Sequence, residues 1–243
     1  MRALSAAELL AVWELALNQA AGRRTLALLA ACSDDQSLEE LAQLSIGQSD
    51  ARLLSFREQA FGSQLAAIAT CPSCGQAVEF EIDVADIRLP SVSASAPIKL
   101  ERDGYGMQFR LPNNLDIASL DPEADEQTKR RSLLSRCLLS ARHSGAEIST
   151  ENLPAEVVTA IAERMAEADP QADVQFALSC PECGHGWSAP LDIGSFVWSE
   201  LNARAVRLLS DVHVLASAYG WSEADILSMS AARRQTYLEL VSQ

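Results

Sequence analysis

The chain has 243 residues, of which 48% are hydrophobic, so it is long enough to bury an apolar core in one or two domains. Its 33 acidic and 19 basic side chains give a formal net charge of −14, which disfavours direct binding to nucleic-acid phosphates. It contains no run of 18 apolar residues and starts without the apolar segment of a signal peptide. We expect a cytoplasmic protein that neither inserts into a membrane nor contacts nucleic acid directly.

The chain is expected to begin with apolar helices. Residues 4–31 carry apolar side chains at helical spacing, and Ser5 with Glu8 forms a capping-box pattern. Gly22 is expected to break this run, with a second short helix over residues 25–31. A polar turn then leads into another short helix.

The next two helices have recognisable ends. Ser37 is expected to cap the helix over residues 38–44. Ser49 or Asp50 is expected to cap a further helix that ends at Gly62. On this last helix Arg57 shares a face with leucine and phenylalanine. It is either the structural partner of an acid or a residue that contacts a binding partner.

Two short cysteine turns are the most informative feature of the sequence. Cys71 and Cys74 enclose Pro and Ser, Cys180 and Cys183 enclose Pro and Glu, and each pair is followed by Gly and then by a strand-like run. The Cys-x-x-Cys spacing brings two sulfurs to one side of a turn, and the glycine permits the positive φ that closes it. Each turn therefore supplies half of a tetrahedral metal site.

The two turns together predict one structural zinc ion per chain, held by four thiolates in a closed site. Residues 75–179 lie between the turns. A loop of this length adds only about 1.5 kcal/mol to the closure cost, whereas structural zinc contributes on the order of 10 kcal/mol. Iron suits the same ligands. His185 is an alternative ligand or a turn residue, and Cys32 and Cys137 are expected to be buried thiols.

The segment between the cysteine turns is expected to form an inserted lobe. After a linker over residues 87–97, it contains the following predicted elements: a hairpin over 98–111 with its turn at Asp103-Gly104, and helices over 113–120, 122–143 and 154–168. The basic cluster Lys129-Arg130-Arg131 is either a solvated helix face or a contact for an acidic partner.

The C-terminal residues 196–243 are expected to form a long helix and two short ones. Gly220 ends the long helix, and Ser222 and Ser230 cap the short ones. Trp221 and Tyr237 either pack these helices together or, with Arg233, contact a partner. The sequence has no phosphate-binding glycine loop, His-Glu-x-x-His motif or Gly-x-Ser-x-Gly motif. We therefore expect no enzymatic activity.

The layout resembles a known family. Residues 208–230 and 233–240 are similar to a small module of contractile-tail baseplate proteins, with an apolar helix, an aromatic-Gly-Trp corner and an Arg-Arg pair. From about residue 45 to residue 243 the chain is similar to the T-even-phage baseplate hub assembly chaperone family, which also occurs in contractile injection systems. There an Asp-Arg-like helix ending in Phe-Gly precedes the first cysteine turn, as residues 50–62 do here, although the spacing of Asp50-Ala51-Arg52 departs slightly from the family pattern.

The resemblance implies a non-enzymatic protein that helps to build a baseplate hub or forms part of it. Its partners would be baseplate, hub or spike subunits. Two other classes stay open: a zinc-ribbon adaptor of transcription or translation, and a Cys-x-x-Cys thiol-redox protein.

The predicted fold class is α+β and predominantly helical, with a split four-cysteine zinc ribbon joining the ends of an inserted lobe. The expected regions are an N-terminal helical region (1–62), the split ribbon (63–89 plus 172–195), the inserted lobe (90–171) and a C-terminal helical module (196–243).

Overall fold

The computed structural model describes residues 1–33, 35–89 and 97–242. The described residues form a mixture of helices and sheets, 55% of them helical, which agrees with the predicted α+β, mainly helical class. The helices are α1 (Ala6–Ala16), α2 (Ala21–Cys32), α3 (Leu38–Ala42), α4 (Ile46–Phe61), α5 (Val84–Ile87), α6 (Asn114–Ala118), α7 (Glu126–Cys137), α8 (Ala155–Ala168), α9 (Ile193–Tyr219), α10 (Glu223–Ser228) and α11 (Ala231–Val241), with 3-10 turns η1 (Thr150–Asn152) and η2 (Pro170–Ala172). The strands are β1 (Gln64–Thr70), β2 (Ala77–Asp83), β3 (Ile98–Arg102), β4 (Tyr105–Phe109), β5 (Leu138–His143), β6 (Ala146–Glu147), β7 (Gln175–Ser179) and β8 (Gly186–Pro190).

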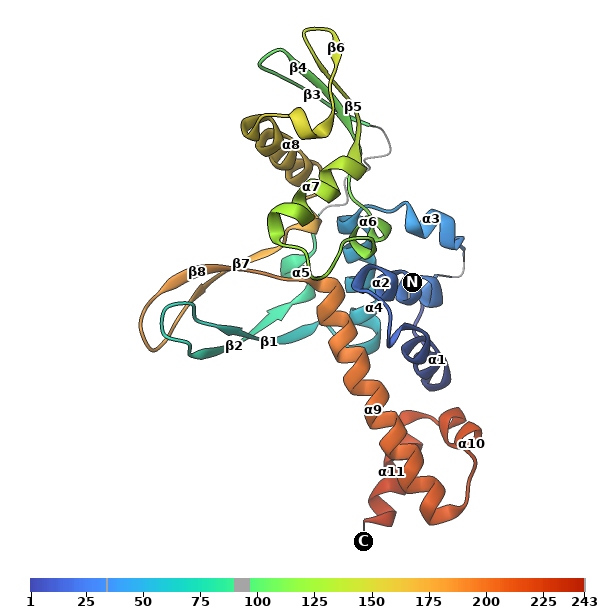
Figure 1. Ribbon diagram of the computed structural model, residues 1–243. Helices are drawn as coiled ribbons and strands as arrows, with labels where there is room; N and C mark the ends of the chain where they lie inside the picture. The colour runs from blue at the N-terminus through green and yellow to red at the C-terminus, as the bar shows by residue number, and fades with distance from the viewer. Residues whose placement is uncertain (34, 90–96, 243) are drawn as a thin grey trace.

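A helical body made of α1, α2, α4 and the first half of α9 lies at the centre of the molecule (Figure 1). Each of these helices contributes apolar side chains to one core. Its largest fully buried members include Leu28, Leu29, Leu53, Leu54, Phe56 and Leu201. The helices pack because each buries an apolar stripe that water would otherwise surround.

The helix starts follow local capping rules. The capping boxes of Ser5 with Glu8 and of Ser37 with Glu40 are both formed. The predicted start of α4 at Ser49 or Asp50 is wrong, because Ser45 and Gln48 make a complete capping box one turn earlier. Ser49 and Asp50 are therefore buried within the helix instead of capping it.

Two glycines in this body have different roles. Gly62 ends α4 with a φ of 92°, as predicted. Gly22 does not break the helix as expected; it lies near the start of α2, where a Cβ would stand 2.0 Å from the carbonyl oxygen of Asn114. Its missing side chain lets α6 pack directly against α2.

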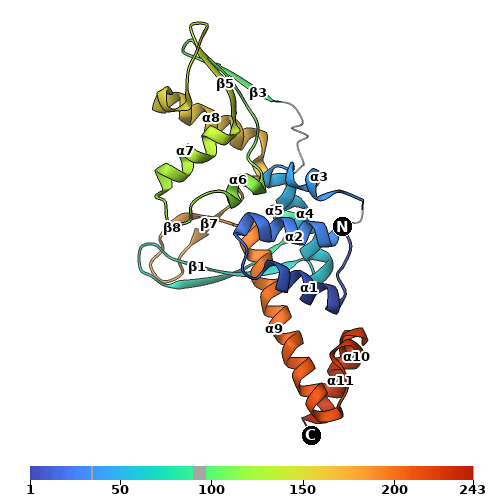
Figure 2. The ribbon, with the colours of Figure 1, turned by 45° about the vertical axis from the view of Figure 1, so that its right-hand side comes forward.

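A second lobe contains the antiparallel sheet β3-β4-β5-β6, with α7 and α8 beside it (Figure 2). It has an apolar cluster of its own: Met107, Phe109, Leu134, Ala141, Leu153, Val157 and Ile161. The predicted turn at Asp103-Gly104 is confirmed, with φ values of 52° and 80°. Most of the linker expected over residues 87–97 lies outside the described residues.

The helix expected over residues 122–143 is too long. It ends at Cys137, and Leu138–His143 forms strand β5, which pairs with β4. The apolar run through Leu138 and Leu139 suits a helix or a strand equally well, and pairing with β4 decides the outcome.

The C-terminal end of the chain projects away from the body on the second half of α9 (Figure 1). Gly220 ends α9 in the left-handed conformation with a φ of 67°, and Ser222 and Ser230 cap α10 and α11, all as predicted. Arg234 of α11 is buried and lies 3.6 Å from Asp211 of α9. Within the described residues, no helix is both long and apolar enough to cross a membrane.

Candidate metal centre

The two cysteine turns are the tips of two antiparallel hairpins that lie side by side (Figure 1). The first hairpin pairs β1 with β2 and follows α4 directly, whereas the second pairs β7 with β8 and leads directly into α9. A two-stranded hairpin alone is marginally stable in water. The edge-to-face contact of Phe80 with Phe176, 5.6 Å between ring centroids, joins the two hairpins.

The two turns have the same backbone geometry. In the first, Cys71 N–H donates to the Gln76 carbonyl at 2.8 Å, and Gly75 N–H donates to the Cys71 carbonyl at 2.9 Å. In the second turn the equivalent distances are 2.9 Å, from Cys180 to His185, and 3.0 Å, from Gly184 to Cys180. Both glycines have a positive φ, 76° and 72°, as the sequence predicts.

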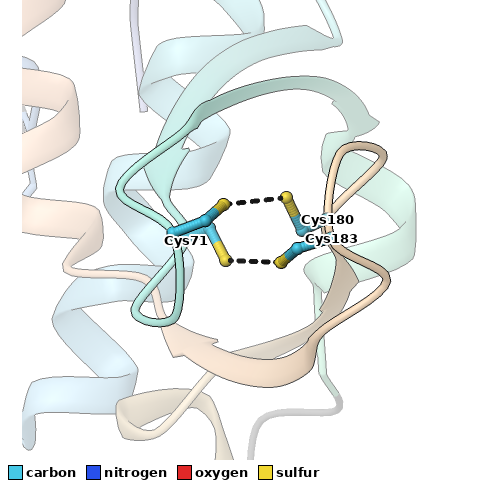
Figure 3. A group of neighbouring side chains, drawn as sticks. Cys71, Cys180 and Cys183 are labelled. Atoms are coloured by element: carbon cyan, nitrogen blue, oxygen red, sulfur yellow. Dashed lines mark hydrogen bonds between the residues drawn. The ribbon is translucent and has the colours of Figure 1, made fainter.

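The two tips face each other through their sulfur atoms (Figure 3). Cys71 Sγ lies 3.7 Å from Cys183 Sγ, and Cys74 Sγ lies 3.6 Å from Cys180 Sγ. All four sulfurs lie within 4.8 Å of one another. Residues from opposite ends of the intervening lobe therefore meet at a single point.

The sulfur spacing fits a tetrahedral metal ion. A zinc–sulfur bond of about 2.3 Å gives a tetrahedron whose sulfur–sulfur edges are about 3.8 Å long. The distances of 3.7 Å and 3.6 Å match that edge. Cys71 and Cys180 are buried while Cys74 and Cys183 reach the surface, so the site is compatible with one metal ion bound near the surface.

The crowded thiols influence one another's ionisation. Burial of Cys71 raises its pKa, but the backbone N–H groups of Cys74 and Ser73 and the neighbouring thiols outweigh burial and lower the pKa to about 7. The N–H of Gln76 lowers the pKa of Cys74, but the other thiols and burial raise it to about 12. Ionisation of one thiol therefore opposes ionisation of the next, because like charges repel. A divalent cation would supply the balancing charge.

The other sulfur and imidazole candidates lie outside this group. The His185 ring stacks on Trp187 with centroids 6.4 Å apart, and its carbonyl closes the second turn. His185 is therefore a turn residue and not one of the clustered ligands. Cys32 and Cys137 are both buried, as expected.

Arg57 lies at the base of the hairpins and not on an exposed surface. Its side chain is 3% exposed and forms an ion pair of 2.8 Å with Glu200 of α9. The same guanidinium donates to the carbonyls of Gly62 and Gln64, where the first hairpin begins. Of the two interpretations left open by the sequence, these contacts favour the structural partner of an acid, and we assign Arg57 no partner contact.

The other candidate partner residues gather in the C-terminal module. Trp221 stacks on Tyr219 with centroids 4.4 Å apart and meets Tyr237 edge to face at 4.8 Å. The guanidinium carbon of Arg233 lies 5.7 Å from the centroid of the Tyr237 ring. Trp221 and Tyr237 are half-buried, so they pack the module and remain partly accessible to solvent. Their role in partner binding stays a prediction.

The basic cluster of α7 lies beside an open groove of about 830 Å³ between α7 and α8. Arg130 and Arg131 are exposed, and Lys129 Nζ donates to the Pro122 carbonyl at 2.6 Å. This arrangement fits a solvated helix face. A contact with an acidic partner stays a prediction.

One residue that the sequence predicted only as a helix cap has an unexpected environment. Asp50 is 8% exposed and lines a second pocket. Burial first, and then the charges of Asp192 and Asp169, raise its pKa to about 8. These acids are far apart in the chain, so no local sequence signal marks their proximity.

The fold and site define a mixed α and β protein whose two hairpins meet in a four-cysteine cluster. A family model described as T4 bacteriophage base plate protein matches residues 8–198, which is more than half of the chain and includes all four cysteines. The chain therefore belongs to the T4 bacteriophage base plate protein family, which supports a structural role in a phage baseplate. No curated protein and no solved structure matches the chain significantly.

The match confirms that the chain belongs to a T4 baseplate family, as the resemblance predicted, but it covers a different range of residues. It begins in α1 and ends in the first part of α9. The C-terminal module with Trp221, Arg233 and Tyr237 therefore lies outside the matched range.

Proposed function

We propose that the protein is a non-enzymatic component or assembly chaperone of a contractile-tail baseplate hub. It acts by binding neighbouring baseplate, hub or spike subunits, while one structural zinc ion holds its two hairpins together. The convergence of four cysteines from two distant hairpins, in a chain of the baseplate family, is the observation that carries this proposal.

The zinc has a structural role in this proposal because four protein sulfurs complete its coordination. A closed tetrahedral site leaves no position for water or substrate, which a catalytic zinc requires. The reduced thiols needed for such a site are normal in the cytoplasm, where we expect the protein to be made. The ion would fix the relative position of α4 and α9, since one hairpin follows the first helix and the other precedes the second.

The two alternative classes are less well supported. A redox Cys-x-x-Cys pair usually lies at a helix N-terminus, whereas both pairs here lie in hairpin turns. An adaptor that binds nucleic acid needs a positive surface, and this chain carries a formal charge of −14.

The test is deletion of the gene in the phage or injection system that encodes it, followed by electron microscopy of the tails. We expect tails without complete baseplates, restored by the wild-type protein and not by a Cys71→Ser, Cys180→Ser double variant. Normal baseplates in the deletion strain would contradict the proposal. Mass spectrometry of purified particles then separates a resident component from a chaperone, because only the component stays in the finished particle.

A further inference from the structure

A pocket of about 360 Å³ lies where α2, α4 and the start of α9 meet. It is separate from the cysteine cluster and from the aromatic cluster of the C-terminal module. Its lining includes Arg24, Asp50, Asp173, Asp192 and Trp198. The pocket thus combines several carboxylates with one guanidinium and one aromatic ring.

Asp50 is the unusual member of this lining. It is 8% exposed, yet among the residues that the structure describes none donates a hydrogen bond to its carboxylate or forms an ion pair with it. A largely buried carboxylate that accepts no hydrogen bond from the protein costs free energy, since it has lost most of its water contacts without compensation. A ligand that enters the pocket and pairs with Asp50 would remove that cost.

The charges around Asp50 favour a cationic ligand. Asp192 accepts hydrogen bonds from Ser195 at the start of α9, and Asp169 accepts one from the backbone of Gly47. Asp173 lies on the pocket lining. These three carboxylates add negative charge near Asp50 from the segments packed around α4, and they disfavour an anionic ligand.

Arg24 of α2 does not neutralise this charge by pairing with Asp50. Its guanidinium lies over the Trp198 ring, 5.1 Å from the centroid, and donates to the Leu17 carbonyl at 3.4 Å. Its Nε is buried without a hydrogen-bond partner. Arg24 therefore forms a wall of the pocket and leaves Asp50 available to another cation.

A metal ion does not suit this pocket. Within the described part of the chain, the four cysteines are the group of His, Cys, Asp or Glu side chains that gather closely enough to hold one. An organic cation is larger and needs fewer ligands. We propose that this pocket binds the head of a lysine or arginine side chain, with Asp50 as its ion-pair partner.

We infer that this lysine or arginine side chain belongs to a neighbouring baseplate subunit. That identification of its source rests on the proposed function. An arginine head would pair with Asp50, since its planar guanidinium can form two parallel hydrogen bonds with a carboxylate. The contact would be buried and specific, because an uncharged side chain at that position would leave Asp50 unpaired.

The pocket can be tested on the purified protein without any partner. The probes are n-butylguanidinium and n-butylammonium chloride, with n-butylurea as a neutral probe of similar shape. Binding is followed through the indole N–H nuclear magnetic resonance signal of Trp198, which a Trp198→Phe variant assigns. We expect both cations to shift this signal in a saturable way and the urea to leave it unchanged.

Two variants locate the effect. Asp50→Asn removes the buried carboxylate and is expected to weaken cation binding at least about tenfold. Asp173→Asn removes one charge from an exposed position of the same pocket and should change the affinity by less than about twofold. The pH dependence of cation binding can be measured on the wild-type chain alone. Because the pKa of Asp50 is raised to about 8, Asp50 becomes negatively charged as the pH rises, and cation binding should tighten between pH 6.5 and pH 9.

Three results would each overturn the pocket proposal. They are the lack of a Trp198 signal shift with either cation, an equal shift with n-butylurea, and an unchanged cation affinity in Asp50→Asn. These results do not depend on baseplate assembly. The gene-deletion phenotype therefore tests the proposed function independently.

Discussion

Arg57 and Glu200 form an ion pair of 2.8 Å that joins α4 to α9 at the base of both hairpins. Arg57 also donates to the Gly62 and Gln64 carbonyls. One side chain therefore ties together the end of α4, the start of the first hairpin and the helix that follows the second. The hairpins are joined at their base by this arginine, and their tips meet at the four sulfurs.

Replacement of Arg57 tests its structural role. Arg57→Leu should lower the free energy of unfolding by about 2–4 kcal/mol, because it leaves buried carbonyls and a carboxylate without donors. Glu200→Gln keeps the side-chain shape and should cost about 1 kcal/mol, since Glu200 is 26% exposed. Urea unfolding measures both values. An Arg57→Leu protein as stable as wild type would contradict the structural assignment.

Asp50 should make stability depend on pH. Its pKa is raised to about 8 in the folded chain, whereas an unfolded aspartate has a pKa of about 3.9. Between these values the folded state binds more protons, so the Asp50 contribution reduces stability as the pH rises, by at most about 1.4 kcal/mol per pH unit.

The Asp50→Asn variant isolates that contribution. Compared with wild type, it should become progressively more stable between pH 4 and pH 8, and the difference should level off above pH 8. Urea unfolding at several pH values measures the difference. A difference that does not change with pH would show that Asp50 is ionised in the folded chain.

Gly22 should tolerate no side chain. In Gly22→Ala the new Cβ would lie 2.0 Å from the Asn114 carbonyl oxygen, so α2 and α6 would have to separate. We expect a loss of about 3 kcal/mol in the free energy of unfolding. Gly106→Ala is the matched control, because a Cβ there meets nothing within 4 Å; its effect should stay below about 1 kcal/mol. Equal effects in thermal unfolding would refute this packing argument.

Substitutions of two adjacent arginines of α11 should distinguish an effect on stability from an effect on partner binding. Arg234 is 4% exposed and donates to the Met229 carbonyl, so Arg234→Ala should cost about 2 kcal/mol. Arg233 is exposed beside Tyr237, so Arg233→Ala should change stability by less than about 1 kcal/mol. If the aromatic cluster contacts a partner, Arg233→Ala should nevertheless complement the gene deletion poorly. Full complementation would remove Arg233 from the partner-binding set.

Local patterns predicted much of the fold. The Cys-x-x-Cys-Gly turns were recognisable because all their geometry lies within six residues, and Gly62, Gly220 and Ser5 act through neighbouring residues only. The gathering of four cysteines in one place also followed, since two half-sites need each other to complete a tetrahedron.

Other features depend on distant parts of the chain. Leu138 joins a strand because β4 is available to pair with it, and Gly22 lies within a helix because α6 needs the space. The burial of Asp50 comes from packing of α4 against segments that contain Asp169 and Asp192. No pattern around residue 50 contains that information.

The most direct test of the metal centre is the metal content of protein purified without added metal, measured by mass spectrometry for wild type, Cys71→Ser and Cys180→Ser. We predict one zinc ion per wild-type chain. Both variants should lose this ion, and their hairpins should no longer unfold cooperatively. Bound iron in place of zinc would keep the four-thiolate site and change the identity of its ion. Wild-type protein free of metal, with thiols that cycle readily to disulfides, would contradict the structural-metal account and favour a thiol-redox protein.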